Sequence, residues 1–438
     1  MDLLLTHGYF LAQDPKELEI MKPYPPLGLL YLSSYLRSKG FGVEIYDSTF
    51  GSPEALFRIL ETERPATLGI YVNLMTRANV LTVVERALAH GWRVILGGPE
   101  ASGYAEEYLE RGAEIVVSGE GELALEAILS GVPRDRIAGL WFRAEGKLVN
   151  TGAADQLANL DLQPWPDRER IDIGRYLEAW RRHHGEGSVS LITARGCPYH
   201  CRWCSHATFG KTHRRRSARG VADEVEWILD RYQPDLLWLA DDVFTIHPGW
   251  LEQYAAEMKR RRLRVPFECI TRADRLSARV ASLLGELGCF RVWIGSESGS
   301  QRILDAMQRG VTVEQVRSAA AQLKAHGIQT GMFFMWGYEG EDLADIEATY
   351  EQVKACRPDI FFTTVSYPIK GTPYFGEVAK KLVQIGPWAS TSDRDWKIRG
   401  RHSRRFYQFA DQLLRSQGPA EAAAARSGME AFYHEVEA

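Results

Sequence analysis

Short apolar runs alternate with longer amphipathic stretches over about the first 130 residues. One helix-length stretch, residues 25–40, places Leu29, Leu32, Ser33 and Leu36 on one side and ends at Gly40, which is the pattern of a helix with a glycine stop. This alternation predicts an α/β fold with a Rossmann-like, doubly wound parallel sheet over residues 1–135. The runs that predict its strands are residues 2–8, 42–47, 67–72, 93–98 and 114–119.

A second alternating series begins at residue 188. Its apolar runs are each followed by a helix-like segment, which predicts a partial (β/α)6 TIM barrel over residues 188–385 with chemistry at the C-terminal ends of the strands. Residues 136–187 are rich in Pro, Arg and aromatic residues and predict a linker, and residues 386–438 predict a small helical region. The six strand-like runs are residues 188–196, 236–242, 267–274, 291–299, 330–337 and 360–372.

Composition narrows the function classes. The chain has 438 residues, 45% hydrophobic and 25% charged, with a formal net charge of −4. This balance gives no reason to expect a nucleic acid or an anionic membrane as partner. No apolar stretch is long enough for a membrane span, and the N-terminus lacks the pattern of a signal peptide. We therefore expect a cytoplasmic protein, in which clustered cysteines are more often metal ligands or redox groups than disulfides.

The stretch "RGCPYHCRWCSHATFG", residues 195–210, contains three cysteines, Cys197, Cys201 and Cys204. A disulfide would leave one of them over, and a redox pair of Cys201 and Cys204 would leave Cys197 unexplained. A zinc site needs four ligands, which His200 or His206 could complete. A 4Fe-4S iron–sulfur cluster held by three thiolates would leave one iron open to another ligand.

The Cys-x3-Cys-x-aromatic-Cys spacing after the first strand of a partial barrel resembles the radical S-adenosylmethionine (SAM) superfamily. The resemblance implies that the three cysteines bind the cluster, that SAM chelates the open iron, and that SAM cleavage gives a 5′-deoxyadenosyl radical. Four later strand ends also match, in "LADDVFT", "CITRAD", "WIGSESGS" and "GMFFMWGYEGE". The residues that the resemblance assigns to the SAM site are Trp203, Asp241, Asp242, Arg272, Gly295, Glu297, Ser298 and Gly337.

Two of these assignments have simpler alternatives. Arg272 and Glu297 could pair with each other across the mouth of the barrel, and Asp241 and Asp242 could cap the following helix. The side-chain partners of these residues in the structure test both alternatives.

The N-terminal region resembles the cobalamin-binding domain that is fused to one radical SAM subfamily. Two glycine-bearing loops carry this resemblance, and their glycines would let the backbone approach a bulky ligand. The only N-terminal histidines, His7 and His90, are outside any Asp-x-His-x-x-Gly segment. Either cobalamin binds without a histidine ligand, or the fold is kept without the cofactor. The residues assigned to cobalamin are Gly97, Gly98, Pro99, Glu100, Gly119, Glu120, Gly121 and Glu122.

The resemblance implies a cobalamin-dependent radical SAM methyltransferase that acts on an unactivated carbon of a small molecule or peptide and takes electrons from a flavodoxin or ferredoxin. A radical cyclase, dehydratase or dehydrogenase acting on a tetrapyrrole or a sugar-like product is the alternative within the superfamily. A zinc-stabilised binding module is the alternative outside it. Methylthiotransferases are excluded because their N-terminal domain holds a second cluster through cysteines, and this chain has none before Cys197.

Overall fold

The computed structural model describes residues 1–438, which pack as two units. The first unit is Met1–Pro198, Ser205–Leu237 and Pro387–Ser392. The second unit is Tyr199–Cys204, Trp238–Gly386 and Asp393–Ala438. The domain borders expected at residues 135, 187 and 385 stay predictions.

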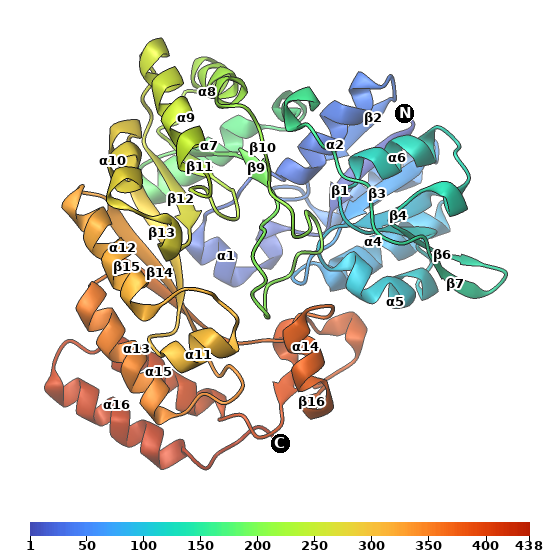
Figure 1. The fold of residues 1–438 in the computed structure, drawn as a ribbon. Coiled ribbons are helices and arrows are strands. Elements are labelled where there is room, and N and C mark those ends of the chain that lie inside the picture. Colours follow the sequence, from blue (N-terminus) through green and yellow to red (C-terminus); the bar gives the residue numbers. More distant parts are fainter. The chain divides into compact units, whose positions relative to one another are not determined.

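The first unit contains a seven-stranded sheet in the order β2-β1-β3-β4-β5-β6-β7 (Figure 1). Its first five strands in chain order pair in parallel, as predicted. Their bounds are β1 Leu3–His7, β2 Val43–Tyr46, β3 Thr67–Tyr71, β4 Arg93–Gly97 and β5 Ile115–Val117.

Helices cover both faces of this sheet. Leu3 and Leu5 of β1 belong to one buried cluster, and Leu4 belongs to another. Side chains of a strand alternate between faces, so the two clusters are the two faces of a doubly wound sheet. The helices of the first unit are α1 Pro15–Ile20, α2 Leu27–Ser38, α3 Pro53–Thr62, α4 Arg77–Ala89, α5 Ala105–Glu110, α6 Glu122–Leu129, α7 Ile173–His184 and α8 Ala218–Tyr232.

A hairpin extends the sheet where the sequence predicted only a linker. Strands β6 (Leu140–Ala144) and β7 (Lys147–Asn150) pair antiparallel, and β6 also pairs antiparallel with β5. The two residues between the strands, Glu145 and Gly146, both have positive φ angles, as the tight two-residue hairpin turn requires. The sequence analysis did not predict these two strands, which lie within residues 136–187.

The second sheet has six strands in the order β15-β14-β13-β12-β11-β8. The strand order follows the chain order, and the pairings from β12 to β15 are parallel. This arrangement confirms the predicted partial-barrel series. Strands β8 and β15 are the open edges of the sheet. The strand bounds are β8 Ser188–Leu191, β11 Leu236–Leu239, β12 Phe267–Thr271, β13 Cys289–Glu297, β14 Gln329–Trp336 and β15 Ile360–Val365.

Helices follow the strands of this series and pack on them. Buried Val292 and Ile294 of β13 and Met332 and Phe334 of β14 form the apolar face, and α10 and α12 contact these strands. The helices between the strands are α9 Pro248–Arg261, α10 Ala278–Leu287, α11 Gln301–Ala306, α12 Val313–Ala325 and α13 Leu343–Cys356.

The C-terminal region is mostly helical, as predicted. Helices α15 (Arg404–Arg415) and α16 (Pro419–Phe432) pack together, with stacked rings of Phe409 and Phe432. The short strands β16 (Leu382–Val383) and β17 (Lys397–Ile398) pair antiparallel, and α14 (Pro373–Val378) precedes them. Every helix of the structure is too short or too polar to span a membrane.

Candidate active site

The three clustered cysteines lie in one loop between two short strands. Strands β9 (Ala194–Arg195) and β10 (Arg214–Arg215) pair antiparallel and enclose residues 196–213. Cys201 is buried, Cys197 and Cys204 are half-buried, and none of the three forms a disulfide. The structure clusters no three His, Cys, Asp or Glu side chains tightly enough to hold a metal ion. The assignment of the thiols as ligands therefore depends on their spacing and their chemistry.

Two buried arginines point at the sulfur of Cys201. Arg309 Nη1 lies 3.5 Å and Arg272 Nη1 lies 3.8 Å from Cys201 Sγ. Arg272 also pairs with Asp274 at 2.8 Å and stacks on the Tyr199 ring, with its guanidinium carbon 3.7 Å from the ring centroid. The two guanidinium groups therefore place positive charge beside this sulfur. This environment fits a ligand to an anionic iron–sulfur cluster.

Glu297 ends β13 in a strained backbone position beside the same arginines. Its φ is 60°, and the register of β13 against β14 shifts between Gly295 and Glu297. Burial raises the pKa of the Glu297 carboxyl, and the nearby charges of Arg309 and Arg272 oppose that shift. The salt-bridge partner of Glu297 is Arg309, at 3.8 Å, whereas Arg272 pairs with Asp274. The alternative of an Arg272–Glu297 pair is therefore wrong.

Arg309 is the site residue that sequence reasoning missed. Besides Cys201 and Glu297, it donates to the carbonyl of Gly295 at 3.1 Å. A Cβ at Gly295 would lie 2.6 Å from the Arg309 guanidinium and from the Glu297 carboxylate, so a side chain there would displace one of these two groups. Arg309 follows helix α11 rather than ending a strand, and its sequence context gave no signal for it.

The other residues predicted for the SAM site have defined surroundings. Asp241 is buried and Asp242 is exposed, and neither caps α9, whose N-cap is His247; the capping alternative is wrong. Ser298 lies 3.3 Å from Thr349 through their hydroxyls. Trp203 packs on a cluster that includes Met307.

The loop after β14 is held by Glu341. Its Oε2 accepts the backbone N–H of Gly337 at 2.6 Å, while its Oε1 is buried with no hydrogen-bond partner. Gly337 itself has a φ of 67°, and a Cβ there would lie 2.8 Å from the Tyr407 hydroxyl. Gly337 is thus required by the turn and by packing.

The glutamates predicted for cobalamin are buried and paired with arginines. Glu100 accepts from Arg77 at 2.6 Å and from the Tyr108 hydroxyl at 2.8 Å. Glu120 pairs with Arg195 and Arg214, and Glu122 pairs with Arg195. These carboxylates have protein partners, so a cofactor would meet the backbone of these loops rather than their acidic side chains.

The backbone of the two loops does fit a bulky ligand. Gly97, Pro99 and Gly121 are half-buried, and the loops follow β4 and β5, which are neighbouring parallel strands. The C-terminal ends of such strands form the ligand crevice of open α/β sheets. Gly98 and Gly119 have positive φ angles, and Cβ atoms there would contact Val72 and Ala154. Their substitution would disturb the fold itself, so it does not test cobalamin binding cleanly.

The two N-terminal histidines have carboxylate partners. His7 is buried, with Nε2 3.1 Å from Asp47 and Nδ1 accepting the N–H of Tyr9 at 3.2 Å. His90 faces Glu61 at 4.0 Å on the surface after α4.

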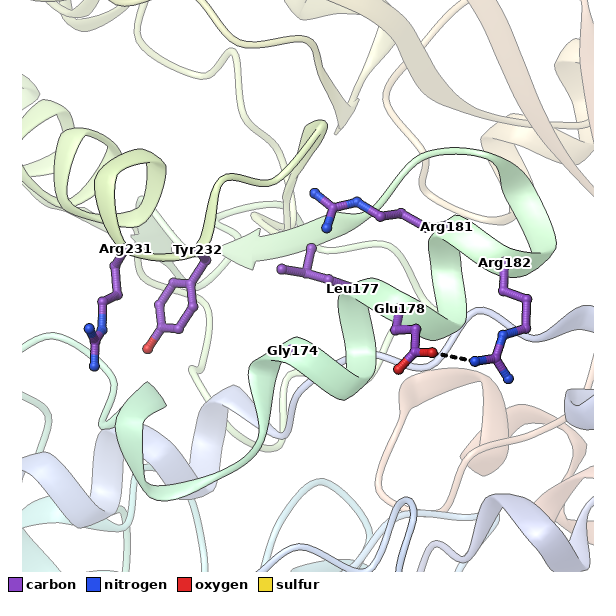
Figure 2. Close-up of a pocket in the computed structure, with 7 residues that line it drawn as sticks. All are labelled: Gly174, Leu177, Glu178, Arg181, Arg182, Arg231 and Tyr232. Atoms are coloured by element: carbon purple, nitrogen blue, oxygen red, sulfur yellow. Dashed lines mark hydrogen bonds and ion pairs between the residues drawn. The ribbon is translucent and has the colours of Figure 1, made fainter.

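A hollow of ≈ 540 Å³ in the first unit contains none of the predicted site residues (Figure 2). Its arginines are already paired, Arg181 with Asp235 at 2.7 Å and Arg182 with Glu178. The hollow is lined by Gly174, Leu177, Glu178, Arg181, Arg182, Arg231 and Tyr232.

Two models of known families match the chain, one in each of the two regions described above. The model of the radical SAM superfamily matches residues 191–353, and the model of the B12 binding domain matches residues 18–129. The chain belongs to the radical SAM superfamily. The two matched regions assign to this radical SAM protein a 4Fe-4S cluster, SAM and cobalamin as cofactors.

Several relatives of this radical SAM protein align over most of its length. An uncharacterized methyltransferase of Pyrococcus horikoshii is 27% identical over 394 residues, covering 86% of this chain and 84% of the relative. The anaerobic magnesium-protoporphyrin IX monomethyl ester cyclase of Rubrivivax gelatinosus is 25% identical, covering 83% of this chain and 68% of the relative.

Two solved structures share its fold. The radical SAM methyltransferase TsrM of Kitasatospora setae superposes with a TM-score of 0.74 at 20% identity, covering 86% of this chain and 76% of TsrM. The cobalamin-dependent radical SAM enzyme OxsB superposes with a TM-score of 0.76 at 17% identity, covering 98% of this chain and 71% of OxsB. At these identities the likeness concerns the fold.

The arginine beside Cys201 should tune the cluster of this radical SAM protein. Arg309→Gln removes one positive charge from beside the Cys201 sulfur. Because the reduced cluster is more negative than the oxidised cluster, losing this charge disfavours the reduced form. We expect the midpoint potential to fall by about 50 mV, measured by anaerobic redox titration with detection of the reduced cluster by electron paramagnetic resonance. Arg291→Gln, which changes an arginine paired with Glu268 in the same unit, is the control. Equal potentials in the two variants and the wild type would remove Arg309 from the cluster environment.

Glu341 should make stability pH-dependent. Burial, with smaller contributions from Asp345 and Asp342, raises its pKa from 4.5 to about 8. Because the folded state holds this proton more tightly than the unfolded state, its contribution to stability is full below pH 4.5 and is lost as pH rises toward about 8. Urea unfolding of Glu341→Gln from pH 5 to pH 9 should show a smaller loss of stability with rising pH than the wild type. Identical slopes for the two proteins would contradict the assignment.

Proposed function

We propose that this chain is a cobalamin-dependent radical SAM methyltransferase that acts on an unactivated carbon of a small molecule or peptide. The observation that carries the proposal is the presence of a B12-binding region and a radical SAM region in one chain. A relative named as a methyltransferase aligns across both regions, over 86% of this chain. Other relatives named as methyltransferases or methylases include the hopanoid C-3 methylase of Methylococcus capsulatus.

For the iron–sulfur cluster, we propose Cys197, Cys201 and Cys204 as the three protein ligands. When bound, such a cluster supplies the electron that cleaves SAM, and its fourth iron is open to that substrate. Arg309 and Arg272, at 3.5 and 3.8 Å from the Cys201 sulfur, would place positive charge beside a bound cluster.

For SAM, we propose the polar groups at the C-terminal ends of β11 to β14. Asp241 and Asp242 follow β11, and Glu297 ends β13. Burial favours the protonated form of the Glu297 carboxyl, while Arg309 and Arg272 favour the anion. A ligand ammonium group would add to the arginines' effect, so SAM binding should be coupled to the ionisation of Glu297.

For cobalamin, we propose the backbone at the C-terminal ends of β4 and β5, including Gly97, Pro99 and Gly121. When bound, cobalamin supplies a transferable methyl group. The loops offer it peptide groups, and both ring nitrogens of His7 already have partners.

A second candidate is a radical cyclase that acts without methyl transfer. It is favoured by three relatives named as anaerobic magnesium-protoporphyrin IX monomethyl ester cyclases, two of them 25% and 26% identical over 83% of this chain. The two functions differ in one observable, because only methyl transfer adds carbon to the substrate.

Radical chemistry of either kind needs an external electron, and we propose a flavodoxin or ferredoxin in the cytoplasm as its source. Radical SAM enzymes act on small-molecule substrates. We infer the donor from the chemistry of the cluster and the location from the need to keep its thiols reduced.

An isotope experiment separates the two functions. The anaerobically reconstituted chain is supplied with SAM carrying a trideuteriomethyl group, a chemical reductant, and separate panels of tetrapyrroles, indoles and phosphonates. We expect one panel member to gain the mass of the labelled methyl group and to stimulate formation of 5′-deoxyadenosine. A product that loses hydrogen without gaining the label would identify the cyclase or dehydrogenase reaction instead.

A further inference from the structure

Glu120 joins the two ends of the cysteine loop. The loop, residues 196–213, starts after Arg195 and ends before Arg214, and these two arginines are partners in the β9–β10 pairing. Glu120 Oε2 accepts from Arg195 Nη1 and from Arg214 Nη1, each at 3.1 Å, and Glu120 Oε1 pairs with Arg214 Nη2. All three residues belong to the first unit.

The pairing is buried and balanced in charge. The side chains of Glu120 and Arg195 are 2% and 4% exposed. Glu122 completes the group: its Oε1 accepts from Arg195 at 2.7 Å and from Gln163 at 2.6 Å. Two carboxylates thus pair with the buried guanidinium of Arg195 and the half-buried guanidinium of Arg214, where each charge depends on its partners.

The backbone shows that the loop is closed at the same place. Gly196, directly before Cys197, has a φ of +85°, and a Cβ there would overlap the carbonyl of Thr212. Arg195 lies over the rings of Tyr31 and Phe209, at 5.0 and 5.2 Å. The first and last residues of the loop are therefore fixed without any contribution from the cysteines.

We propose that Glu120, supported by Glu122, is a positioning residue that clamps the base of the cysteine loop and orders it before iron arrives. Glu120 follows β5, in the loop of the B12-binding region. A ligand that shifts this loop would therefore also shift the clamp. The inference depends on the proposed function only in taking the cysteines as cluster ligands.

The test uses hydrogen–deuterium exchange of the full, iron-free chain. Glu120→Gln keeps the size of the side chain and removes its charge, which leaves buried Arg195 with Glu122 alone and takes the carboxylate from half-buried Arg214. We expect amides of residues 196–213 to exchange at least about tenfold faster, with little change in β1 and β3. Incorporation of iron and sulfide into the variant under anaerobic reconstitution should be slower by a similar factor.

Asp47→Asn is the matched control. Asp47 is a largely buried acid of the same unit, hydrogen-bonded to His7 at 3.1 Å and to Tyr176 at 2.6 Å. Removing the charge of Asp47 should leave hydrogen exchange in the cysteine loop unchanged. If Glu120→Gln does not fold, Arg214→Gln provides the same readout, because it opens one side of the clamp while Arg195 keeps both carboxylates.

Wild-type exchange in the loop of a folded Glu120→Gln or Arg214→Gln chain would overturn the proposal, as would an equal effect of Asp47→Asn. Because the exchange is measured without iron, SAM or cobalamin, its result is independent of methyl transfer. Failure of methyl transfer with a loosened loop would count against the proposed function and not against the clamp.

Discussion

Buried carboxylates of this chain lie against arginines where three of its strands, β4, β5 and β13, end. Glu100 faces Arg77 after β4, Glu120 and Glu122 face Arg195 and Arg214 after β5, and Glu297 faces Arg309 at the end of β13. A buried ion pair contributes little net stability, but removing one partner costs about 3 to 5 kcal/mol. These three loops are thus fixed by pairs whose members depend on each other.

This constraint changes how the glycine–glutamate loops are understood. From sequence alone, the glutamates of the two glycine-bearing loops, Glu100, Glu120 and Glu122, were expected to face a cofactor. In the structure they turn inward to arginines, and the half-buried backbone is what remains for cobalamin. The partners of Glu120 lie 75 and 94 residues away along the chain, a separation at which sequence gives no indication of pairing.

The strands were predictable because their physical signal is local. In β1, Leu3 and Leu5 face one core and Leu4 the other, and such continuous apolar runs are typical of sheets covered on both faces. The β6–β7 hairpin was missed because Arg143 and Lys147 interrupt its apolar pattern, although Glu145-Gly146 was a turn signal. Arg309 was missed for another reason: its role comes from the tertiary contact with Cys201, not from its neighbours in sequence.

The central claim is that one chain carries both a thiolate-bound iron–sulfur cluster and cobalamin. The most direct measurement is iron, zinc, sulfide and corrinoid content after anaerobic reconstitution with cobalamin and gel filtration, beside a variant with Cys197, Cys201 and Cys204 all changed to Ala. We predict about four irons and one corrinoid per wild-type chain, and corrinoid without iron in the variant. Zinc in place of iron, or iron without retained corrinoid, would contradict the claim.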